Sequence, residues 1–460
     1  MSDFSLIAVV VAISVVSFFL SPRVETTDGF FKGFDKFGQA PSLWTLTLSQ
    51  VTTWIFARSL MNAAILGFYY GIAGTLAYAA YYLSFLTGGY IVDRVRFEHG
   101  YDSIQAFLFD RYGRVGTTSY NILVGVRLLS EVFANLLVIG IIFGVAGSTG
   151  YTVSIIAVAV LTLAYSMMGG LRASLRTDVF QTLLLVGGLG VLAIIMFLTP
   201  QFEIPAILGS SPSLDGPGWI LLGVAALQVW SYPMHDPVMM DRGFLADRKT
   251  TQKSFQYACG ISVLAILIFG ILGVYAGLNK ESGEAMVAAL TRLLGEPAMI
   301  IFNVALVVSA VSTLDSTFSS SSKLVVDQMG VMQKTVRNGR IVMALFLLGG
   351  LFFLFLGQKD LFAAVAVSGT ASMFLTPVIF FNIMMKRDTA LWAYVVSFFI
   401  ALAGGALYMM EAGGHVSLMT PLLGLEHKYA KLLVICITVL GVGMTSFALG
   451  SVQRLKEENA

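Results

Sequence analysis

The sequence predicts an all-α polytopic membrane protein, and its composition carries this prediction. Of the 460 residues, 57% are hydrophobic (AVILMFWYC) and only 12% are Asp, Glu, Lys or Arg. The mean hydropathy is +0.82. Soluble domains carry about 25% charged residues, so this chain has too few polar side chains to cover a water-exposed surface. With only two cysteines, a disulfide framework or Cys-rich metal site is excluded, and a net charge of +2 offers no face for nucleic acid.

Apolar runs separated by charged or Gly/Pro-rich stretches define the expected spans. A helix needs about 20 mostly apolar residues to cross the roughly 30 Å hydrocarbon core of a bilayer. Thirteen runs are predicted to cross, near residues 4–20, 42–67, 69–92, 118–146, 151–168, 178–198, 217–241, 254–277, 297–326, 341–357, 361–385, 390–410 and 430–450. The first run has neither a basic leader nor a small-residue cleavage site, so we interpret it as a retained span.

The distribution of Lys and Arg predicts the orientation of the chain. With the N-terminus outside, 20 of the 28 Lys and Arg residues fall in inward loops, 5 fall in outward loops, and Arg58, Arg127 and Lys323 lie within spans. Cytoplasmic loops carry the excess of basic residues in membrane proteins. We therefore predict an integral protein of the plasma membrane (in bacteria, the inner membrane) with its N-terminus outside and its C-terminus in the cytoplasm. The longest inward loop is expected at 93–117, so no soluble domain is predicted.

Polar side chains gather at the midpoint of the second span, where a lipid-facing helix tolerates few of them. They are Ser49, Gln50, Thr52 and Thr53. Ser and Thr side chains can hydrogen-bond to the nearby backbone and so favour local departures from the helix. The second span is therefore predicted to be irregular at its centre.

The seventh span is interrupted in a similar way. Residues 228–237 read QVWSYPMHDP, and Pro233 and Pro237 remove two helical hydrogen bonds. His235 and Asp236, between these prolines, are expected to pack at the kink or at a gate. Interrupted helices in two segments five spans apart are typical of a transporter binding site built from inverted repeats. For either span alone, an ordinary kink with Ser and Thr bonded to their own backbone is the alternative.

The ninth span carries four hydroxyl groups on one face. Ser309, Ser312, Thr313 and Ser316 follow the i, i+3, i+4, i+7 spacing, and Asp315 flanks them. Hydroxyl and carboxylate oxygens suit a hard cation such as sodium. A stripe of this kind is also typical of close helix packing, but a carboxylate at membrane depth indicates a functional site.

The fourth span contains a charged pair at i, i+4 spacing. Arg127 and Glu131 can neutralise each other, and Asn135 follows on the same face. One interpretation is that this pair is structural. The other is that Arg127 meets an anionic group of a substrate, a role for which Arg58 in the second span is an equal candidate. Of the four histidines only His235 lies at membrane depth, so the His-rich metal centre of an intramembrane enzyme is not expected.

Together these segments give the chain a resemblance to the sodium/solute symporter family, which includes bacterial proline, sialic acid and sugar symporters. Residues 165–181, YSMMGGLRASLRTDVFQ, resemble the family's Gly-Gly-Leu…Thr-Asp-x-x-Gln loop before the sixth span. Residues 310–316, followed by Asp327, resemble its ninth span. Weaker matches lie at 104–113 and at Pro237…Arg242, and the resemblance extends over about residues 40–390.

The resemblance implies a leucine-transporter-type fold with two inverted five-helix repeats. A single transmembrane domain over residues 1–460 would then consist of an extra first helix and linker (1–41), a first repeat (42–198), a second repeat (217–385), and two C-terminal helices with a tail (386–460).

The resemblance also implies sodium sites between the second and ninth spans. The ligands of the first would be the carbonyls of Leu48, Val51 and Ser309 and the hydroxyls of Ser312 and Thr313. Some family members have a second sodium site, which maps here to Asp178, Ser312, Asp315 and Ser316. For Asp178 there is an alternative role, because Asp178 and Gln181 can also form a capping box at the start of the sixth span.

The substrate is expected to bind near the two interrupted spans. The candidate residues are Gln50, Thr53, Trp54, Arg58, Arg127, Glu131, Gln228 and Trp230. The eighth span lacks the lysine of sugar-carrying relatives, and an intramembrane arginine favours a small carboxylate or an amino acid. We predict a sodium-coupled symporter that imports such a solute by alternating access, not an enzyme, with Na+, the solute and the lipid bilayer as its partners. The alternative is a transporter-like sensor that signals through a separate partner.

Overall fold

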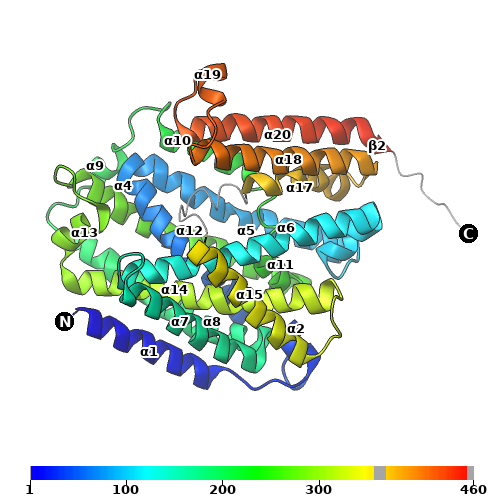
Figure 1. Cartoon of the computed structure of the whole chain (residues 1–460), viewed down its shortest axis with the longest axis horizontal. Coiled ribbons are helices and arrows are strands. Elements are labelled where there is room, and N and C mark those ends of the chain that lie inside the picture. Colours follow the sequence, from blue (N-terminus) through cyan, green and yellow to red (C-terminus); the bar gives the residue numbers. More distant parts are fainter. Residues whose placement is uncertain (1, 357–368, 453–460) are drawn as a thin grey trace, which may run out of the picture.

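The computed structural model describes residues 2–356 and 369–452, and its regular structure is almost entirely helical. In the described residues, nine helices are long and apolar enough to cross a membrane, and three shorter apolar helices accompany them. These helices run roughly along one common direction, which is horizontal in Figure 1. The prediction of an all-α polytopic membrane protein is therefore confirmed, whereas the number of thirteen crossings stays a prediction.

The elements follow one another along the chain, with the η segments forming 3-10 or π turns at helix ends. They are α1 (Ser2–Leu20), α2 (Thr27–Lys32), α3 (Leu43–Trp54), α4 (Ala57–Ala80), η1 (Tyr81–Leu83), α5 (Ser84–Val92), η2 (Asp93–Glu98), α6 (Ile104–Phe143), α7 (Thr149–Gly169), α8 (Leu171–Leu198), α9 (Ile204–Leu208), α10 (Pro217–Gln228), α11 (Pro237–Gly243), α12 (Arg248–Leu278), α13 (Met286–Leu294), α14 (Glu296–Ser322), η3 (Lys323–Gln328), α15 (Val336–Leu356), η4 (Ser372–Phe374), α17 (Leu375–Pro377), η5 (Val378–Met384), β1 (Asp388–Thr389), α18 (Leu391–Ala412), α19 (Met419–Leu423), α20 (Lys428–Gly450) and β2 (Ser451–Val452).

Two expectations about helix boundaries are wrong. The predicted loop 93–117 is largely helical, because η2 covers Asp93–Glu98 and α6 already begins at Ile104. A sharp bend at Gly113, with φ 59°, separates the first turns of α6 from its long apolar part. Asp178 lies two turns inside α8, which begins at Leu171, so it does not open a helix and the capping-box interpretation fails.

The second predicted span is broken in two, as its polar midpoint indicated. Helix α3 ends at Trp54 and α4 begins at Ala57, and Phe56 between them is extended with ψ 154°. No glycine or proline stands at this break. Instead, Asn135 of α6 accepts a hydrogen bond from the Ala57 amide (3.1 Å), and the hydroxyl of Ser309 donates to the carbonyl of Ile55. Neighbouring helices thus satisfy the backbone groups that the break releases at membrane depth.

The seventh predicted span is also broken, into α10 and α11. The chain leaves the helix after Gln228 and re-enters it at Pro237, which occupies the first helical position where a missing N–H costs nothing. Asp236 caps the new helix, because its Oδ1 accepts a hydrogen bond from the Met239 amide at 3.1 Å. Pro237 therefore begins a helix, and Pro233 lies in the non-helical segment between α10 and α11.

Helix α4 is held against α12 by a seam of glycines. A Cβ at Gly273 would lie 1.9 Å from the carbonyl oxygen of Ala64, and one at Gly67 would lie 2.1 Å from that of Gly270. Only glycine permits backbones to approach this closely, and small residues are the usual means of packing helices within a bilayer. The seam fixes the position of the half-helix that begins at the break after Trp54.

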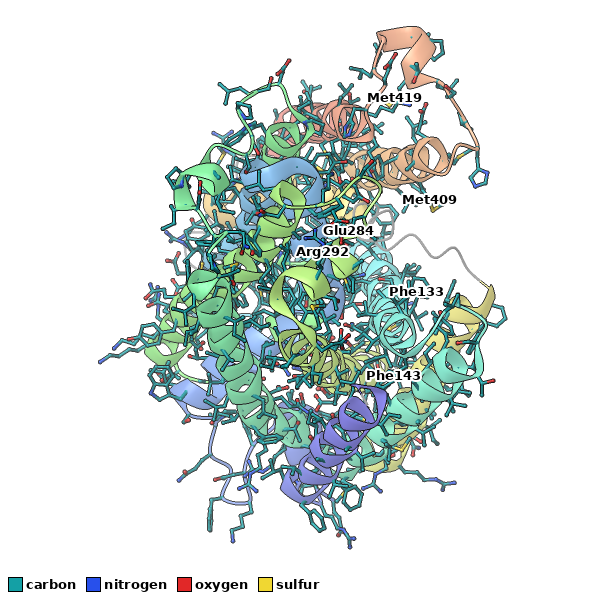
Figure 2. All side chains as sticks on the ribbon, turned by 90° about the vertical axis from the view of Figure 1, so that its left-hand side faces the viewer. Phe133, Phe143, Glu284, Arg292, Met409 and Met419 are labelled. Atoms are coloured by element: carbon teal, nitrogen blue, oxygen red, sulfur yellow. The ribbon has the colours of Figure 1, made fainter. Side chains whose placement is uncertain are left out.

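The ends of the bundle differ in the charges that they carry. In the end-on view of Figure 2, Glu284 and Arg292 lie together at the end that carries α9 and α13, with their side chains 2.7 Å apart. The Arg292 guanidinium lowers the pKa of Glu284 to about 2.

Helices α18 and α20 lie side by side at one edge of the bundle (Figure 1). The short antiparallel pair β1–β2 joins the start of α18 to the end of α20.

Candidate functional site

The two broken helices meet at Asp236. The indole Nε1 of Trp54, the last residue of α3, donates to Asp236 Oδ2 at 2.7 Å. The same oxygen accepts a hydrogen bond from Arg127 Nη2 of α6 at 3.2 Å. A single buried carboxylate therefore joins the end of α3, the start of α11 and the middle of α6. The sequence suggested packing at a kink for Asp236 but did not reveal these partners.

Two buried arginines lie beside the break in the second span, and their surroundings differ. The guanidinium carbon of Arg58 lies 5.1 Å, and that of Arg127 5.3 Å, from the ring centroid of Phe56. Arg127 is 2.7 Å from Glu131 in addition to its contact with Asp236. The predicted helical pair is thus present, and its positive charge has two carboxylate partners.

Arg58 has no such partner. It is 0% exposed, and among the described residues none of its three guanidinium nitrogens has a hydrogen-bond or ion-pair partner. A buried, unpaired charge costs several kcal/mol. Asn62, one turn further along α4, is also buried with an unpaired side-chain nitrogen. Such groups, aimed into the interior beside a helix break, are suited to bind an anionic ligand.

A small aromatic cavity opens at the same break. Its lining consists of Trp54, Phe56, Ser59, Tyr78, Tyr81, Tyr82 and Tyr232. The hydroxyl of Tyr82 donates to the carbonyl of Trp54 at 3.0 Å, and the rings of Tyr82 and Tyr232 lie edge-on to Trp54. The cavity measures about 20 Å³, far less than a solute needs, so the site is closed in this structure. The tyrosines were not among the expected site residues.

Four other residues expected to bind the substrate differ in their surroundings. Gln228 accepts from the Tyr81 hydroxyl at 2.9 Å and donates to Thr370 at 3.2 Å, so its amide is used in packing. Trp230 packs on Phe380, with ring centroids 5.1 Å apart, and does not line the aromatic cavity. Thr53 donates to the carbonyl of Gln50 at 3.3 Å. The Gln50 amide itself is buried, and no described residue hydrogen-bonds to it.

The carbonyl groups expected in the first sodium site lie in the last turns of α3. The Leu48 carbonyl accepts from the Thr182 hydroxyl of α8 at 2.7 Å. The Val51 carbonyl accepts from the Ile55 amide at 3.0 Å, as the last helical hydrogen bond before the break. The break therefore lies one turn beyond Val51.

The other ligands of this set lie on α14, against the break. Ser309 touches it directly through its hydrogen bond to Ile55. The Thr313 hydroxyl donates to the Ser309 carbonyl at 2.9 Å, and the Ser312 hydroxyl donates to Asp178 at 2.7 Å. The five expected ligand atoms are all oxygens on two helices in contact, and the hydroxyls can be turned toward a cation by side-chain rotation. This donor set fits a hard cation such as sodium.

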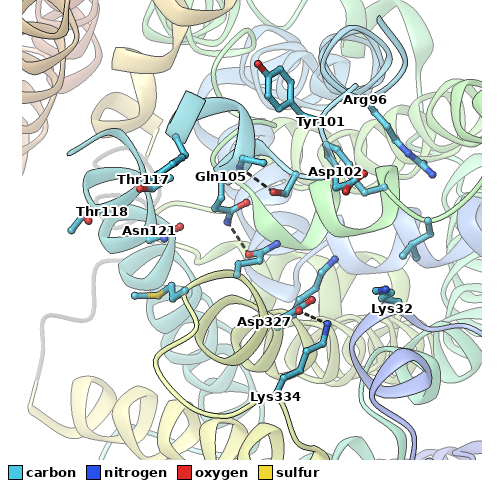
Figure 3. Close-up of a pocket in the computed structure, with 18 of the residues that line it drawn as sticks. Lys32, Arg96, Tyr101, Asp102, Gln105, Thr117, Thr118, Asn121, Asp327 and Lys334 are labelled. Carbon is cyan, nitrogen blue, oxygen red and sulfur yellow. Dashed lines mark hydrogen bonds and ion pairs between the residues drawn. The ribbon is translucent and has the colours of Figure 1, made fainter. Parts of the chain in front are cut away.

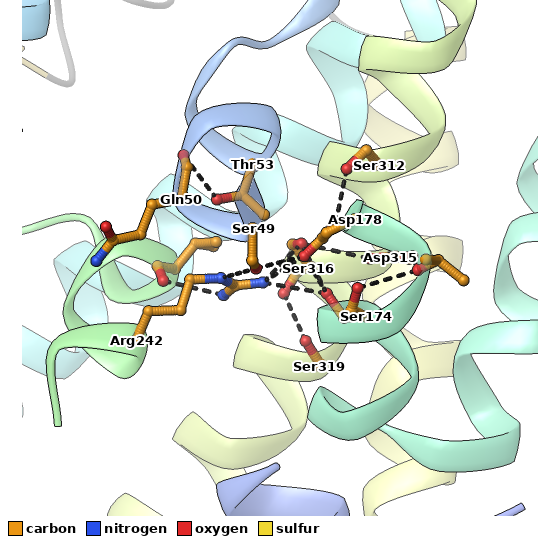
Figure 4. Close-up of polar contacts among 12 residues, drawn as sticks. Ser49, Gln50, Thr53, Ser174, Asp178, Arg242, Ser312, Asp315, Ser316 and Ser319 are labelled. Carbon is orange, nitrogen blue, oxygen red and sulfur yellow. Dashed lines mark hydrogen bonds and ion pairs between the residues drawn. The ribbon is translucent and has the colours of Figure 1, made fainter. Parts of the chain in front are cut away.

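The residues expected to bind a second sodium ion lie beside a positively charged side chain, that of Arg242. Asp178, Ser312, Asp315 and Ser316 are brought together between α8 and α14, all completely buried. The guanidinium of Arg242, from α11, reaches into this group, 3.2 Å from Asp178 and 2.9 Å from the Ser316 hydroxyl (Figure 4). From its position in the sequence, Arg242 was expected only in an inward loop, at the end of a weak family match. Nothing in the chain order indicated its contact with α8.

A large cavity opens at the other end of the bundle, which is the predicted cytoplasmic end. It measures about 870 Å³, and basic side chains, among them Lys32, Arg96 and Lys334, line it together with Asp102 and Asp327 (Figure 3). At its inner wall, Lys323 of η3 is 2.8 Å from Asp241 of α11. Helix α11 thus stands between this cavity and the interior.

Comparison with known proteins supports the resemblance found in the sequence. The model of the sodium:solute symporter family matches residues 38–200. No curated protein sequence matches the chain significantly.

Two solved structures have the same fold. One is a Na+-coupled sialic acid symporter in a substrate-bound, outward-open state, with a TM-score of 0.72, 16% identity and 99% of each chain covered. The other is Mhp1, a nucleobase-cation-symport-1 family transporter, in a closed conformation with bromovinylhydantoin bound. Its TM-score is 0.53 at 14% identity, covering 91% of this chain and 95% of that one. The predicted leucine-transporter-type fold is confirmed.

Proposed function

We propose that this chain is a sodium-coupled symporter that imports a small polar organic solute bearing a carboxylate group, such as a carboxylic acid or an amino acid, by alternating access. The family match and the transporter fold support sodium-coupled transport. The solute class rests on Arg58, and the ion site rests on the contact between α3 and α14.

The buried, unpaired guanidinium of Arg58 is the observation that carries the solute class. A carboxylate would accept two parallel hydrogen bonds from it, which is the geometry in which arginine binds carboxylates most strongly. Helix α4 also begins at the break, and the N-terminal ends of helices favour anions. The aromatic residues of the cavity would surround the apolar part of the solute. Arg127 is unsuited to this role because Glu131 and Asp236 already neutralise it.

The proposed sodium ion couples to this site through the break in the second span. A cation held by oxygens of Leu48, Val51, Ser309, Ser312 and Thr313 would tie α3 to α14 while the solute occupies the adjacent cavity. In the predicted orientation, with the N-terminus outside, sodium and solute enter together and leave into the basic cavity of Figure 3. Rocking of one repeat against the other around this fixed site would expose it alternately to each side.

Uptake of labelled solutes into proteoliposomes tests the proposal. Purified protein is first screened by thermal shift against carboxylates, amino acids, polyols and sugars, with and without sodium, since a ligand that binds the folded state stabilises it. We expect stabilisation by a carboxylate-bearing solute, and sodium-driven uptake of it. Uptake also separates a transporter from a sensor, which would bind the solute without moving it.

The Arg58→Gln variant tests the solute class. Loss of a hydrogen bond to a charged group costs about 1.5–3 kcal/mol, so solute affinity should fall roughly 10- to 150-fold. The matched control is Arg292→Gln, which removes an arginine outside the membrane and should leave the affinity unchanged. Stabilisation by uncharged polyols alone, or an unchanged affinity in Arg58→Gln, would contradict the proposal.

A further inference from the structure

We propose that the guanidinium of Arg242 takes the place of a second sodium ion, so that the protein binds one sodium ion in each transport cycle. This inference deepens the proposed function, on which it rests. It concerns the cluster that Asp178, Ser312, Asp315 and Ser316 form with Arg242, shown in Figure 4. In family members with a second site, the corresponding residues are expected to hold a sodium ion.

The carboxylate of Asp178 already accepts four hydrogen bonds, one of them from a cation. Its Oδ2 accepts from the hydroxyls of Ser49 at 2.5 Å and Ser174 at 3.2 Å and from Arg242 Nη2 at 3.2 Å. Its Oδ1 accepts from the Ser312 hydroxyl at 2.7 Å. An ionised carboxylate has about four acceptor positions, two on each oxygen, so the three donors saturate Oδ2 and a metal ion could approach only Oδ1.

Arg242 is held in this position by all three of its nitrogens. Nε donates to the Ser49 hydroxyl at 2.7 Å, and Nη1 donates to the Val238 carbonyl at 3.0 Å. Nη2 is shared among Ser174, Asp178 and Ser316, at 3.1, 3.2 and 2.9 Å. The side chain is 0% exposed. Unlike Arg58, it has a partner for every nitrogen, as expected of a charge that belongs to the closed structure.

The remaining carboxylate does not offer an alternative site. Asp315 Oδ2 accepts from the Thr177 hydroxyl at 2.7 Å, and Oδ1 accepts from the Ser316 hydroxyl at 3.3 Å. Ser316 in turn accepts from Arg242. A sodium ion bridging Asp315 and Asp178 would have to enter a hydrogen-bonded group that already contains a cation. Arg242 already balances the charge of Asp178, so repulsion between the guanidinium and the sodium ion would oppose the attraction of the ion to Asp315.

The positive charge of Arg242 differs from a bound sodium ion because it is covalently part of the chain and cannot be released. Arg242 belongs to α11 and contacts residues of α3, α8 and α14, so it neutralises Asp178 without dissociating from the protein. The second site is then permanently occupied, and only the site at the break in the second span takes up and releases sodium.

Direct counting of bound ions tests the inference. Equilibrium binding of radioactive sodium to the purified full-length protein should give one ion per chain. In Arg242→Gln the carboxylate of Asp178 loses its cation, so two ions should bind. The double variant Arg242→Gln/Asp178→Asn should return to one, and Arg242→Lys, which keeps a cation, should stay at one. The matched control is Arg248→Gln, an arginine that is half-exposed and pairs with Asp93.

The outcomes separate this inference from the proposed function. If the wild-type protein binds no sodium, the proposed function fails. If the wild-type protein binds two sodium ions, sodium coupling stands and the role of Arg242 is refuted. A folded Arg242→Gln protein that still binds one ion also refutes it. Should Arg242→Gln fail to fold, Arg242→Met, which also removes the cation, takes its place, with two bound ions expected and one bound ion refuting the inference.

Discussion

Substitution by methionine should change the free energy of unfolding in opposite directions at the two arginines beside Phe56. Arg58→Met removes a charge that has no partner among the described residues, whereas Arg127→Met removes one that pairs with Glu131 and Asp236. Methionine keeps most of the length of the side chain and is apolar. We therefore expect Arg58→Met to stabilise the solute-free protein and Arg127→Met to destabilise it.

The magnitudes follow from the burial of both groups, which are 0% and 1% exposed. Replacing a buried ion pair by apolar residues of similar volume is often neutral or stabilising by about 1–4 kcal/mol, whereas breaking a buried pair by removing one partner costs about 3–5 kcal/mol. For the unpaired charge of Arg58 we expect a stabilisation of about 1–4 kcal/mol. The two variants should thus differ by about 4–9 kcal/mol in free energy of unfolding. At the same time Arg58→Met should lose solute binding, because a stabilising change at a binding site commonly costs function.

Thermal unfolding of the detergent-purified proteins measures this difference. The buffer must contain no carboxylate, since acetate or citrate could pair with Arg58 and mask its cost. The midpoint should rise in Arg58→Met and fall in Arg127→Met relative to the wild type. Equal falls in both variants would refute the reasoning, because Arg58 would then have a structural role like that of Arg127.

Three further predictions concern the ion site, the glycine seam and a surface ion pair. Thr313→Ala should abolish sodium-stimulated uptake while the protein stays folded, because it removes a proposed sodium ligand. Gly273→Leu should destabilise the protein by about 3 kcal/mol or more, measured by thermal unfolding, because its Cβ would lie 1.9 Å from the Ala64 oxygen. The Glu284–Arg292 pair lowers the pKa of Glu284 to about 2, so its contribution to stability should be complete above the unfolded pKa of about 4.5 and be lost as pH falls toward 2.

Each of these predictions has a control. Thr291→Ala removes the same kind of backbone-bonded hydroxyl outside the proposed site and should leave sodium dependence intact. Gly260→Leu fills a position with no atom within 4 Å and should be tolerated. For the ion pair, the stability difference between wild type and Glu284→Gln is followed from pH 7 to pH 3. A difference that does not shrink on acidification would show that the carboxylate charge is irrelevant.

The breaks in the helices could be predicted from the sequence, but their positions could not. Two prolines indicated a break in the seventh span, and α11 begins at Pro237, but α10 ends at Gln228, well before Pro233. The break after Trp54 contains no such residue and lies one turn beyond Val51, where Asn135 and Ser309 satisfy the freed backbone groups. Those two residues are 78 and 254 positions away from the groups they bind, so local pattern could not locate the break.

For the charged groups too, contacts within one helix could be predicted from the sequence, whereas contacts between distant segments could not. The pairing of Arg127 with Glu131 follows from helical spacing alone and was predicted as one of two interpretations. The second partner, Asp236, is 109 residues distant and depends on how the two breaks meet. Gln228 and Trp230 were expected to cover one side of the solute. Gln228 bonds to Tyr81 and Thr370, and Trp230 packs on Phe380, and these contacts between distant segments do not follow from spacing along the chain.

Helix α11 has only seven residues, yet two consecutive side chains tie it to different walls of the bundle. Asp241 is paired with Lys323 of η3, and Arg242 is paired with Asp178 of α8. Because the two ion pairs are formed by adjacent residues of one short helix, α11 cannot rotate about one pair without straining the other. Release of solute toward the basic cavity should therefore move α11 together with both walls, so that neither pair parts and no half-open intermediate forms.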